Sequence, residues 1–310
     1  GAVHVGVVAL LEVINVEHHQ RQRPVVAASA TEFALERLRE GGVEVDVAET
    51  SAPGQAVDIA RTAYAEGRRH FIAVGGDGTG YEIVNGLFPA AAGGADHDRP
   101  VLGFLPMGTG NSFLRDFTDA GAEHSIEAIL SGRRRRCDVI CLEHEAGVLH
   151  YINLLSIGFV ADVNGLRARR FSGWGELGYV AAVVTTVVGL RSRAFPMAVD
   201  GIADHEPMVF ASFNNSRFTG GKMMMAPEAE TDDGRIDLIR VDPLGRFDLL
   251  RTFPKIFKGT HVQHPAVQTA KVERVEFDLG EEIDVMVDGE ALRVIPKALW
   301  VLPGALDVQV

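Results

Sequence analysis

The chain has 310 residues, of which 46% are hydrophobic and 23% charged, as in a globular protein long enough for two domains. Its net charge of −12 at pH 7 argues against a general nucleic-acid binder, since such proteins carry a basic working face. Two cysteines, Cys137 and Cys141, are too few for a disulfide scaffold or a four-cysteine zinc site, so we expect reduced thiols in a cytoplasmic protein.

The apolar stretches do not predict a membrane-spanning chain. The opening stretch "GAVHVGVVALLEV" lacks the basic region of a signal peptide. The longest apolar run, Tyr179 to Leu190, is too short to cross a bilayer. We therefore expect a cytoplasmic protein that contacts membranes only peripherally, and whether it forms a homodimer stays open.

The first part of the chain alternates strand and helix patterns. Strand-like apolar runs lie at residues 4–14, 43–50, 70–76 and 101–106. Helical periodicity lies between them, at residues 30–42, 56–67 and from Tyr81. This alternation predicts an α/β domain over residues 1–136, with a parallel sheet, covering helices and ligands near the strand ends.

From Cys137 the pattern changes. Seven strand-like stretches, separated by turns, cover residues 137–143, 148–159, 197–201, 208–215, 235–241, 272–278 and 283–295. Two helical patches interrupt them, at residues 175–190 and 243–257. We expect residues 137–310 to form a β-rich second domain.

A glycine-rich loop follows the strand at residues 70–76. It reads Gly75, Gly76, Asp77, Gly78 and Thr79. Glycines permit φ > 0 and remove Cβ atoms, and backbone N–H groups before a helix form an anion site. Thr79 can cap the helix or bond a phosphate, with Glu82 as its capping-box partner. Asp77 would repel a phosphate unless a cation or a bonded backbone compensates; the alternative is a simple strand–helix turn.

A second loop of the same design runs from Leu105 to Phe117. It contains Gly108, Thr109, Gly110 and Asn111, the last of which is expected to open a helix. Two such loops at strand ends of one sheet would face one cleft. Neither has the Gly-Lys-Ser/Thr ending of a P-loop or the spacing of the dinucleotide fingerprint, so we expect a nucleotide site of another type.

The stretch "GGDGTGYEIVNGL", followed by "LPMGTGNSF", resembles the diacylglycerol kinase catalytic-domain superfamily, which includes bacterial lipid kinases and sphingosine and ceramide kinases. The resemblance continues through "INLLSIGFVADV", "GGKMMMAPEAETDDGRIDLIRV" and "VMVDGEALRV", in order from about Phe71 to Pro303. It implies a Rossmann-like α/β nucleotide domain and a C-terminal β-sandwich-like domain, with the active site in the cleft between them and the last strand packing back on the first domain.

The resemblance also implies site residues, with ATP as co-substrate and Mg²⁺ as cofactor. The nucleotide site would comprise Gly75, Gly76, Asp77, Gly78, Thr79, Glu82, Asn85, Gly108, Thr109, Gly110 and Asn111. Asp288 and Glu290 match the family's catalytic acidic pair, and Asp77 joins them in catalysis. Asp288 and Glu290 flank Gly289 on a strand or its turn, so both carboxylates would point to one side, which raises the proton affinity of one of them; the alternative is an exposed Asp-Gly hairpin.

Two departures from the family pattern stand out. Residues 13–25, "VINVEHHQRQRPV", lack the family's Asn-Pro loop, although Arg21 or Arg23 could supply positive charge. Ser112 replaces an Asp found in many bacterial members, a role for which Asp116 is a partial substitute.

Three further features have alternative interpretations. The acids Asp232, Asp233 and Asp237 offer oxygens for a magnesium or calcium ion, or form a solvated turn. Arginines 133–136 can attract an anionic membrane surface, or oppose a helix dipole. Residues 175–190 and 222–227 would line a lipid pocket, or belong to the core.

The leading hypothesis is an ATP-dependent lipid kinase that transfers the γ-phosphoryl group to a hydroxyl of a lipid such as diacylglycerol or a sphingoid base. An NAD kinase-like enzyme and a catalytically inactive nucleotide- or lipid-binding relative are the alternatives. The sequence does not identify the lipid.

Overall fold

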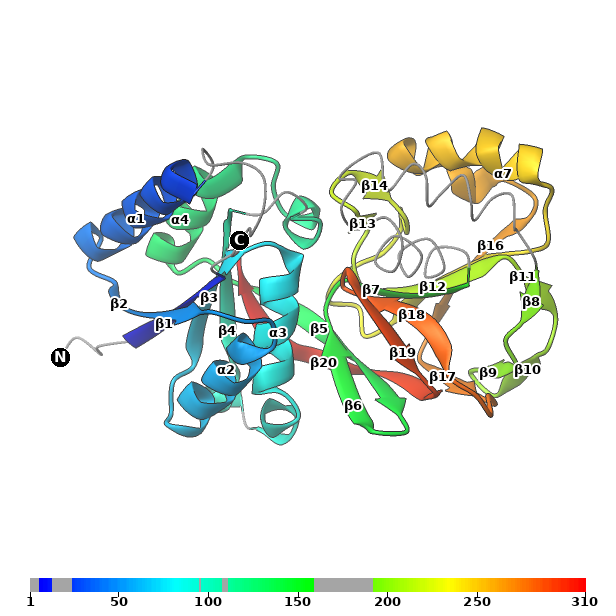
Figure 1. Ribbon diagram of the computed structural model, residues 1–310, viewed down its shortest axis with the longest axis horizontal. Coiled ribbons are helices and arrows are strands. Elements are labelled where there is room, and N and C mark those ends of the chain that lie inside the picture. Colours follow the sequence, from blue (N-terminus) through cyan, green and yellow to red (C-terminus); the bar gives the residue numbers. More distant parts are fainter. Residues whose placement is uncertain (1–5, 13–23, 95, 108–110, 159–191) are drawn as a thin grey trace. The chain divides into compact units, whose positions relative to one another are not determined.

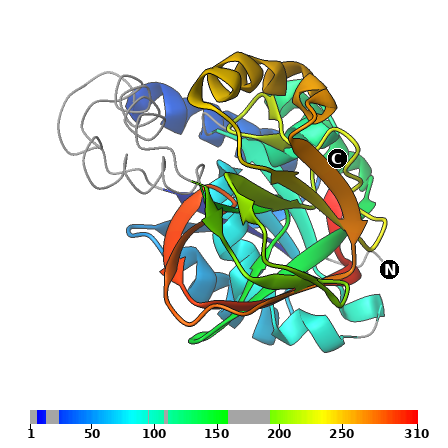
Figure 2. The same ribbon diagram turned by 90° about the vertical axis from the view of Figure 1, so that its right-hand side faces the viewer.

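The computed structural model describes residues 6–12, 24–94, 96–107, 111–158 and 192–310 (Figures 1 and 2). The chain divides into two compact units. Unit 1 comprises Gly1–Cys137 together with Gly304–Val310, and unit 2 comprises Asp138–Pro303. The boundary expected from the sequence, after residue 136, lies next to this division.

Unit 1 contains a parallel sheet with strand order β20-β4-β3-β1-β2. The strands are β1 (Gly6–Glu12), β2 (Glu44–Thr50), β3 (His70–Gly75), β4 (Val101–Pro106) and the end of β20 (Pro296–Gln309). The middle of β3, Phe71–Val74, is buried throughout, as expected for a parallel strand covered on both faces. The N-terminal α/β prediction is confirmed.

Helices cover this sheet (Figure 1). They are α1 (Pro24–Glu40), α2 (Gln55–Ala65), α3 (Asp77–Leu87) and α4 (Gly121–Ser131), with short 3-10 helices η1 (Ala90–Gly93), η2 (Asp96–Asp98) and η3 (Phe113–Asp116). From α1 and α4, Leu38 and Ile126 join the core cluster that includes Ile72 of β3. At Gly86, where α3 packs on α2, a Cβ atom would lie 2.4 Å from the Val57 carbonyl oxygen, so the contact requires glycine.

Unit 2 is built on a six-stranded antiparallel sheet with order β16-β15-β12-β7-β18-β19. Its strands are β7 (Leu154–Gly158), β12 (Phe210–Asn214), β15 (Ile236–Val241), β16 (Val267–Val272), β18 (Ile283–Val287) and β19 (Glu290–Val294). β7, β12 and β15 are buried along their whole length, which places them at the centre of the core.

Further antiparallel strands complete unit 2. They are β5 (Arg135–His144), β6 (Gly147–Tyr151), β8 (Arg193–Ala194), β9 (Met197–Val199), β10 (Ile202–Asp204), β11 (Pro207–Met208), β13 (Phe218–Thr219), β14 (Met223–Met224) and β17 (Arg274–Phe277), with the first part of β20. The β-rich prediction for the second part of the chain is confirmed.

The predicted helical patch at residues 243–257 contains α7 (Arg246–Thr252), followed by η6 (Phe253–Lys258) and η7 (Thr260–Gln263). The other patch, at residues 175–190, lies outside the described residues. In the part of the chain that the structure describes, no helix is long and apolar enough to cross a membrane.

Candidate functional site

The first glycine loop is a tight strand-to-helix connection. β3 ends at Gly75 and α3 begins at Asp77, so Gly76 alone separates them. Gly76 has φ −107° and ψ −165°, an extended conformation open to any residue. Gly76 therefore does not use the positive φ that glycine permits, and room for a close approach is the reason that remains for glycine there. The first N–H groups of α3, which have no partner within the helix, follow directly.

Two helical residues of α3 differ from the expected capping box. Thr79 is 3% exposed and lies inside the first turn, so it is not the cap. The Glu82 carboxylate instead accepts the Gly54 N–H at 2.7 Å and the Ala56 N–H at 3.1 Å. Glu82 thus caps the start of α2 and ties it to α3. The Asn85 amide donates to the Tyr81 carbonyl oxygen of the same helix at 2.9 Å.

Asp77 connects the first loop to the second. Its Oδ2 atom accepts the Ser112 N–H at 2.9 Å, and its Oδ1 atom accepts the Phe113 N–H at 3.3 Å. These donors begin η3, where a negative charge is favourable. The bonded backbone that we expected to compensate for the charge of Asp77 is therefore supplied by Ser112 and Phe113.

The end of the second loop also packs against the core of unit 1. Phe113 packs against Phe104 of β4, with ring centroids 5.4 Å apart, and Ser112 is buried. Asn111 has φ +44°, a left-handed conformation that asparagine tolerates. The expected helix after it is only the short η3, and the predicted residues Gly108, Thr109 and Gly110 lie outside the described residues.

The predicted acidic pair lies at a hairpin turn between β18 and β19. Val287 pairs with Glu290, so Asp288 and Gly289 form a two-residue turn with φ of +46° and +95°. The hairpin expected as the alternative is therefore present, and strand alternation, which does not extend through a turn, gives no reason to place both carboxylates on one side. Asp288 is 4% exposed, whereas Glu290 is exposed.

The Asp288 carboxylate accepts three backbone N–H groups. Its Oδ2 atom bonds Ile152 at 3.1 Å, and its Oδ1 atom bonds Asn153 at 3.1 Å and Leu154 at 2.9 Å. Charge-assisted bonds of this kind offset the burial of an ionised carboxylate. Asp288 thus fixes the hairpin turn against the start of β7.

A buried polar cluster that sequence reasoning missed surrounds this contact. Its members are Asp138, Asn153, Asn215, Ser216 and Asp288, each at most 4% exposed. The Asn215 amide donates to the carbonyl oxygens of Asp138 at 3.0 Å and Ile152 at 2.9 Å. The Asp138 Oδ2 atom accepts the Gly234 N–H at 2.6 Å. Asparagines inside the apolar stretches 148–159 and 208–215 were the available signal.

The predicted metal ligands do not form a cation site. The Lys271 ammonium group lies 2.5 Å from Asp233 and 3.8 Å from Asp237, where a metal ion would have to bind. Asp233 also accepts the Arg235 N–H at 2.9 Å, as expected of the alternative turn, and Asp232 is exposed. Among the described residues, no three His, Cys, Asp or Glu side chains are arranged to hold a metal ion. The geometry therefore argues against this predicted site.

Two other candidates have structural roles. Arg134 and Arg136 pair with Asp307 at 4.0 and 3.5 Å, so part of the arginine run anchors the end of β20. Cys137 and Cys141 are buried and free. Burial raises the pKa of the Cys141 thiol to about 12, which keeps it protonated. Both cysteines are reduced core residues, as expected.

Comparison with known proteins covers nearly the whole chain. Residues 27–142 match the model of the diacylglycerol kinase catalytic domain, and residues 153–310 match that of the YegS C-terminal NAD kinase beta sandwich-like domain. A relative from Mycobacterium tuberculosis named "Diacylglycerol kinase" is 29% identical over 289 residues, which are 91% of this chain and 90% of the relative.

Two further comparisons agree. A Chromohalobacter salexigens relative named "Probable lipid kinase YegS-like" is 32% identical, over 88% of this chain and 86% of its own. A solved structure of a Bacillus anthracis protein, provisionally named a diacylglycerol kinase, has TM-score 0.74 at 20% identity and covers 99% of this chain and 97% of that protein, which shows the shared fold. On these matches, the chain belongs to the diacylglycerol kinase catalytic-domain superfamily, with its α/β domain followed by the β-sandwich-like domain.

Proposed function

We propose that this protein is an ATP-dependent lipid kinase, which transfers the γ-phosphoryl group to a hydroxyl of a lipid such as diacylglycerol or a sphingoid base. The observation that carries the proposal is the bond between Asp77 and the backbone of Ser112 and Phe113. That bond joins the start of α3, within the first glycine-threonine sequence, to Ser112 and Phe113, which follow the second such sequence after the neighbouring strand β4. The names of the relatives support the reaction class.

In this proposal the first loop binds the nucleotide phosphates. Gly76 leaves the backbone uncovered, and N–H groups at the start of α3 donate to phosphate oxygens. The remaining contacts would come from Gly75, Asp77, Gly78, Thr79, Gly108, Thr109, Gly110 and Asn111. Glu82 acts at a distance, since its carboxylate caps α2. In this proposal Asn85, which bonds the Tyr81 carbonyl oxygen of α3, braces the first loop together with Glu82.

The donors fit Mg²⁺ that arrives with the nucleotide. Mg²⁺ keeps several waters and is usually held by one or two carboxylates and the substrate phosphates, so no cage of protein ligands is required. Asp77 carries one hydrogen bond on each oxygen, and a carboxylate has about four lone-pair sites, so capacity remains. The ion would neutralise phosphate charge during transfer.

The lipid hydroxyl needs an acceptor for its proton, and we assign this role to Glu290. The Asp288 carboxylate is buried and already accepts three N–H groups, whereas the Glu290 side chain is exposed at the same hairpin. Asp288 is then the positioning residue, because it fixes the turn from which Glu290 projects. Since the lipid lies in a bilayer, the proposal also includes peripheral membrane contact.

The test is a transfer assay with γ-³²P-labelled ATP against diacylglycerol, sphingosine and ceramide in mixed micelles, with NAD as a fourth acceptor. The proposal expects label in at least one lipid, in a reaction that requires Mg²⁺. Label in NAD and in no lipid would favour the NAD kinase-like alternative. Absence of transfer to every acceptor, with ATP still bound, would favour an inactive relative.

A further inference from the structure

The helical segment 246–258, which comprises α7 and η6, has one side built into the core of unit 2. Leu249 and Ile256 are 9% and 6% exposed and join the cluster that includes Phe210 of β12 and Val241 of β15. Thr252, between them, is also buried. The spacing of these three positions follows one helical side, so the opposite side faces away from the sheet (Figures 1 and 2).

The outward side of the segment is apolar. Phe247 is 74% exposed, and Leu250 and Phe257 are each 53% exposed. Most large apolar side chains of the described residues are buried, so three exposed ones within eleven positions form an unusual concentration. This apolar side contributes nothing to the core of unit 2.

The same segment is basic in an acidic protein. It carries Arg246, Arg251, Lys255 and Lys258 against the single acid Asp248, while the whole chain has a net charge of −12. All four basic residues are exposed. Among the described residues, none of them forms an ion pair with an acid, in contrast to Arg134 and Arg136. Their charge is thus available to an external anionic partner.

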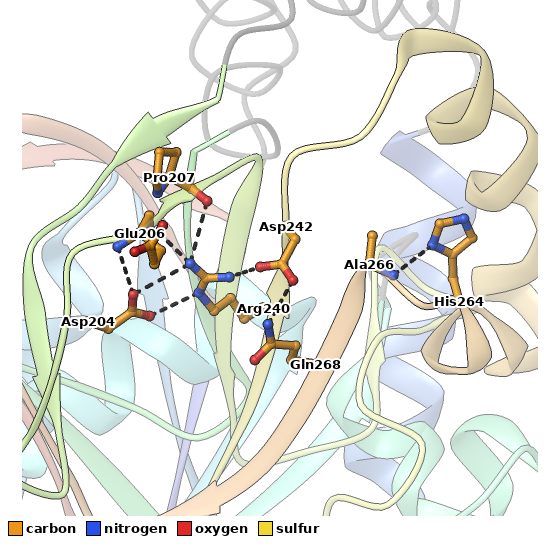
Figure 3. A network of polar contacts seen from close by, with 8 residues as sticks. All are labelled: Asp204, Glu206, Pro207, Arg240, Asp242, His264, Ala266 and Gln268. Carbon is orange, nitrogen blue, oxygen red and sulfur yellow. Dashed lines mark hydrogen bonds and ion pairs between the residues drawn. The ribbon is translucent and has the colours of Figure 1, made fainter.

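The base of the segment is firmly held (Figure 3). The Asp242 N–H donates to the Ala266 carbonyl oxygen at 2.8 Å, and Gln268 donates to the Asp242 carboxylate at 2.7 Å. Arg240, buried at 6% exposure, pairs with both Asp242 and Asp204. The chain therefore leaves and rejoins the sheet at one fixed place, which gives the segment a defined orientation on unit 2.

We propose that the segment 246–258 is the surface through which this protein docks on an anionic lipid bilayer. Phe247, Leu250 and Phe257 would enter the boundary between headgroups and acyl chains, as apolar faces of interfacial helices do. The surrounding lysines and arginines would contact lipid phosphates. The basic charge on an acidic chain favours a negatively charged surface, and the exposed phenylalanines favour a bilayer over a hydrated polyanion. The inference rests on the proposed function only for the reason why the protein would bind a membrane. The exposed apolar and basic side chains are observed independently of that function.

Vesicle sedimentation without ATP tests the surface directly. The wild-type chain is expected to bind phosphatidylglycerol-containing vesicles and to bind pure phosphatidylcholine vesicles far more weakly. The double variant K255Q/K258Q should lower the partition coefficient about thirtyfold at low salt, at about fivefold per basic residue. The matched control R37Q/R39Q removes the same charge from the exposed positions of α1 and should change it less than about twofold.

The apolar side has its own pair of variants. F247S/L250S/F257S should abolish the binding that survives high salt, whereas V148S/I202S, which removes exposed apolar side chains elsewhere, should not. Thermal melting checks that each variant is folded. Equal binding by test and control variants, or no binding of the wild type to anionic vesicles, would overturn the inference. The vesicle assay measures no turnover, so its outcome is independent of the kinase assay. Vesicle binding would support the docking surface even if no kinase activity were found, and kinase activity on micellar lipid would not support the docking surface if vesicle binding were absent.

Discussion

The Oδ2 atom of Asp77 accepts the backbone N–H of Ser112 at 2.9 Å, although the two residues are 35 positions apart in the chain. This bond links the end of β3 to the loop that follows β4, its parallel neighbour in the sheet. If the first loop binds phosphates, as we propose, an unbonded acid there would repel the ligand. The Asp77 carboxylate instead bonds Ser112 and Phe113, and this arrangement leads to specific expectations for variants.

Replacing Gly76 or Gly78 by Val should weaken ATP binding at least about tenfold, a loss of about 1.4 kcal/mol. Gly76 has an extended conformation that Val adopts readily, so the effect would come from bulk against the phosphates and not from backbone strain. Titration calorimetry measures the affinity. Gly280→Val is a control, because a Cβ atom there meets nothing within 4 Å. Unchanged affinity in folded Gly76 and Gly78 variants would reduce the loop to a turn.

Asp77→Asn should lower kcat about a hundredfold and weaken ATP binding by a smaller factor, because the second loop, which shares the proposed nucleotide contacts, moves from its position. The amide nitrogen of Asn faces a backbone N–H that the carboxylate accepted, so unfolding free energy should also fall by about 1–3 kcal/mol. Steady-state kinetics and thermal melting measure the two effects. Asp58→Asn, at an exposed position of α2, serves as the control. Wild-type turnover in Asp77→Asn would remove this residue from the mechanism.

Glu290→Gln should lower kcat by a factor of about 10²–10⁴ for loss of the general base, and Asp288→Asn should lower kcat by moving the turn that carries Glu290, both with ATP affinity nearly unchanged. Their stabilities should differ. Asp288→Asn disturbs three buried N–H bonds and should cost about 2–4 kcal/mol, whereas Glu290 is exposed and its variant should melt like the wild type. Melting curves with matched rate measurements separate the roles. Full activity in Glu290→Gln would disprove its assignment as the base.

Asp237 should make the protein less stable above neutral pH. Burial, only partly offset by Lys271, raises its pKa from 3.8 to about 6. Because the pKa is raised in the folded state, folding favours the protonated Asp237 side chain. Its contribution to the free energy of unfolding is complete below pH 3.8 and is lost as the pH rises through 6. Asp237→Asn should therefore raise the unfolding free energy by about 1–3 kcal/mol at pH 8. At pH 4 the variant should gain nothing.

Denaturant unfolding at the two pH values measures this difference. Asp232→Asn is the matched control, since Asp232 is exposed on the same turn. A gain for Asp237→Asn that is equal at pH 4 and pH 8 would contradict the ionisation account.

The sequence predicted the strands of unit 1 closely, because buried parallel strands are continuous apolar runs with glycine or proline at their ends. The expected strand at 101–106 coincides with β4. The helix expected at 30–42 begins earlier, at Pro24. Its start was predicted too late because its first turns carry no marked apolar periodicity. The apolar pattern did not mark β20 as a separate strand, but the family resemblance implied that the last strand packs back on the first domain, and the end of β20 does pair with β4.

The candidate site was predictable in its loops but not in its contacts. Glycine and threonine patterns mark a loop after a strand, but they do not show that Asp77 reaches Ser112 or that Glu82 reaches Gly54. The prediction from strand alternation failed at Asp288 because β18 ends at Val287 and the turn begins at Asp288. Buried hydrogen bonds between distant segments have no local signal, so Asp138 and Asn215 were missed.

The central claim is γ-phosphoryl transfer to a lipid hydroxyl, and the most direct measurement compares two labels in one assay. With γ-³²P-labelled ATP and diacylglycerol or sphingosine in mixed micelles, the account predicts that label enters the lipid fraction, and that Gly76→Val removes the signal. With α-³²P-labelled ATP, it predicts label in ADP and none in lipid. Lipid that stays unlabelled with γ-labelled ATP, or that acquires the α label, would contradict the account.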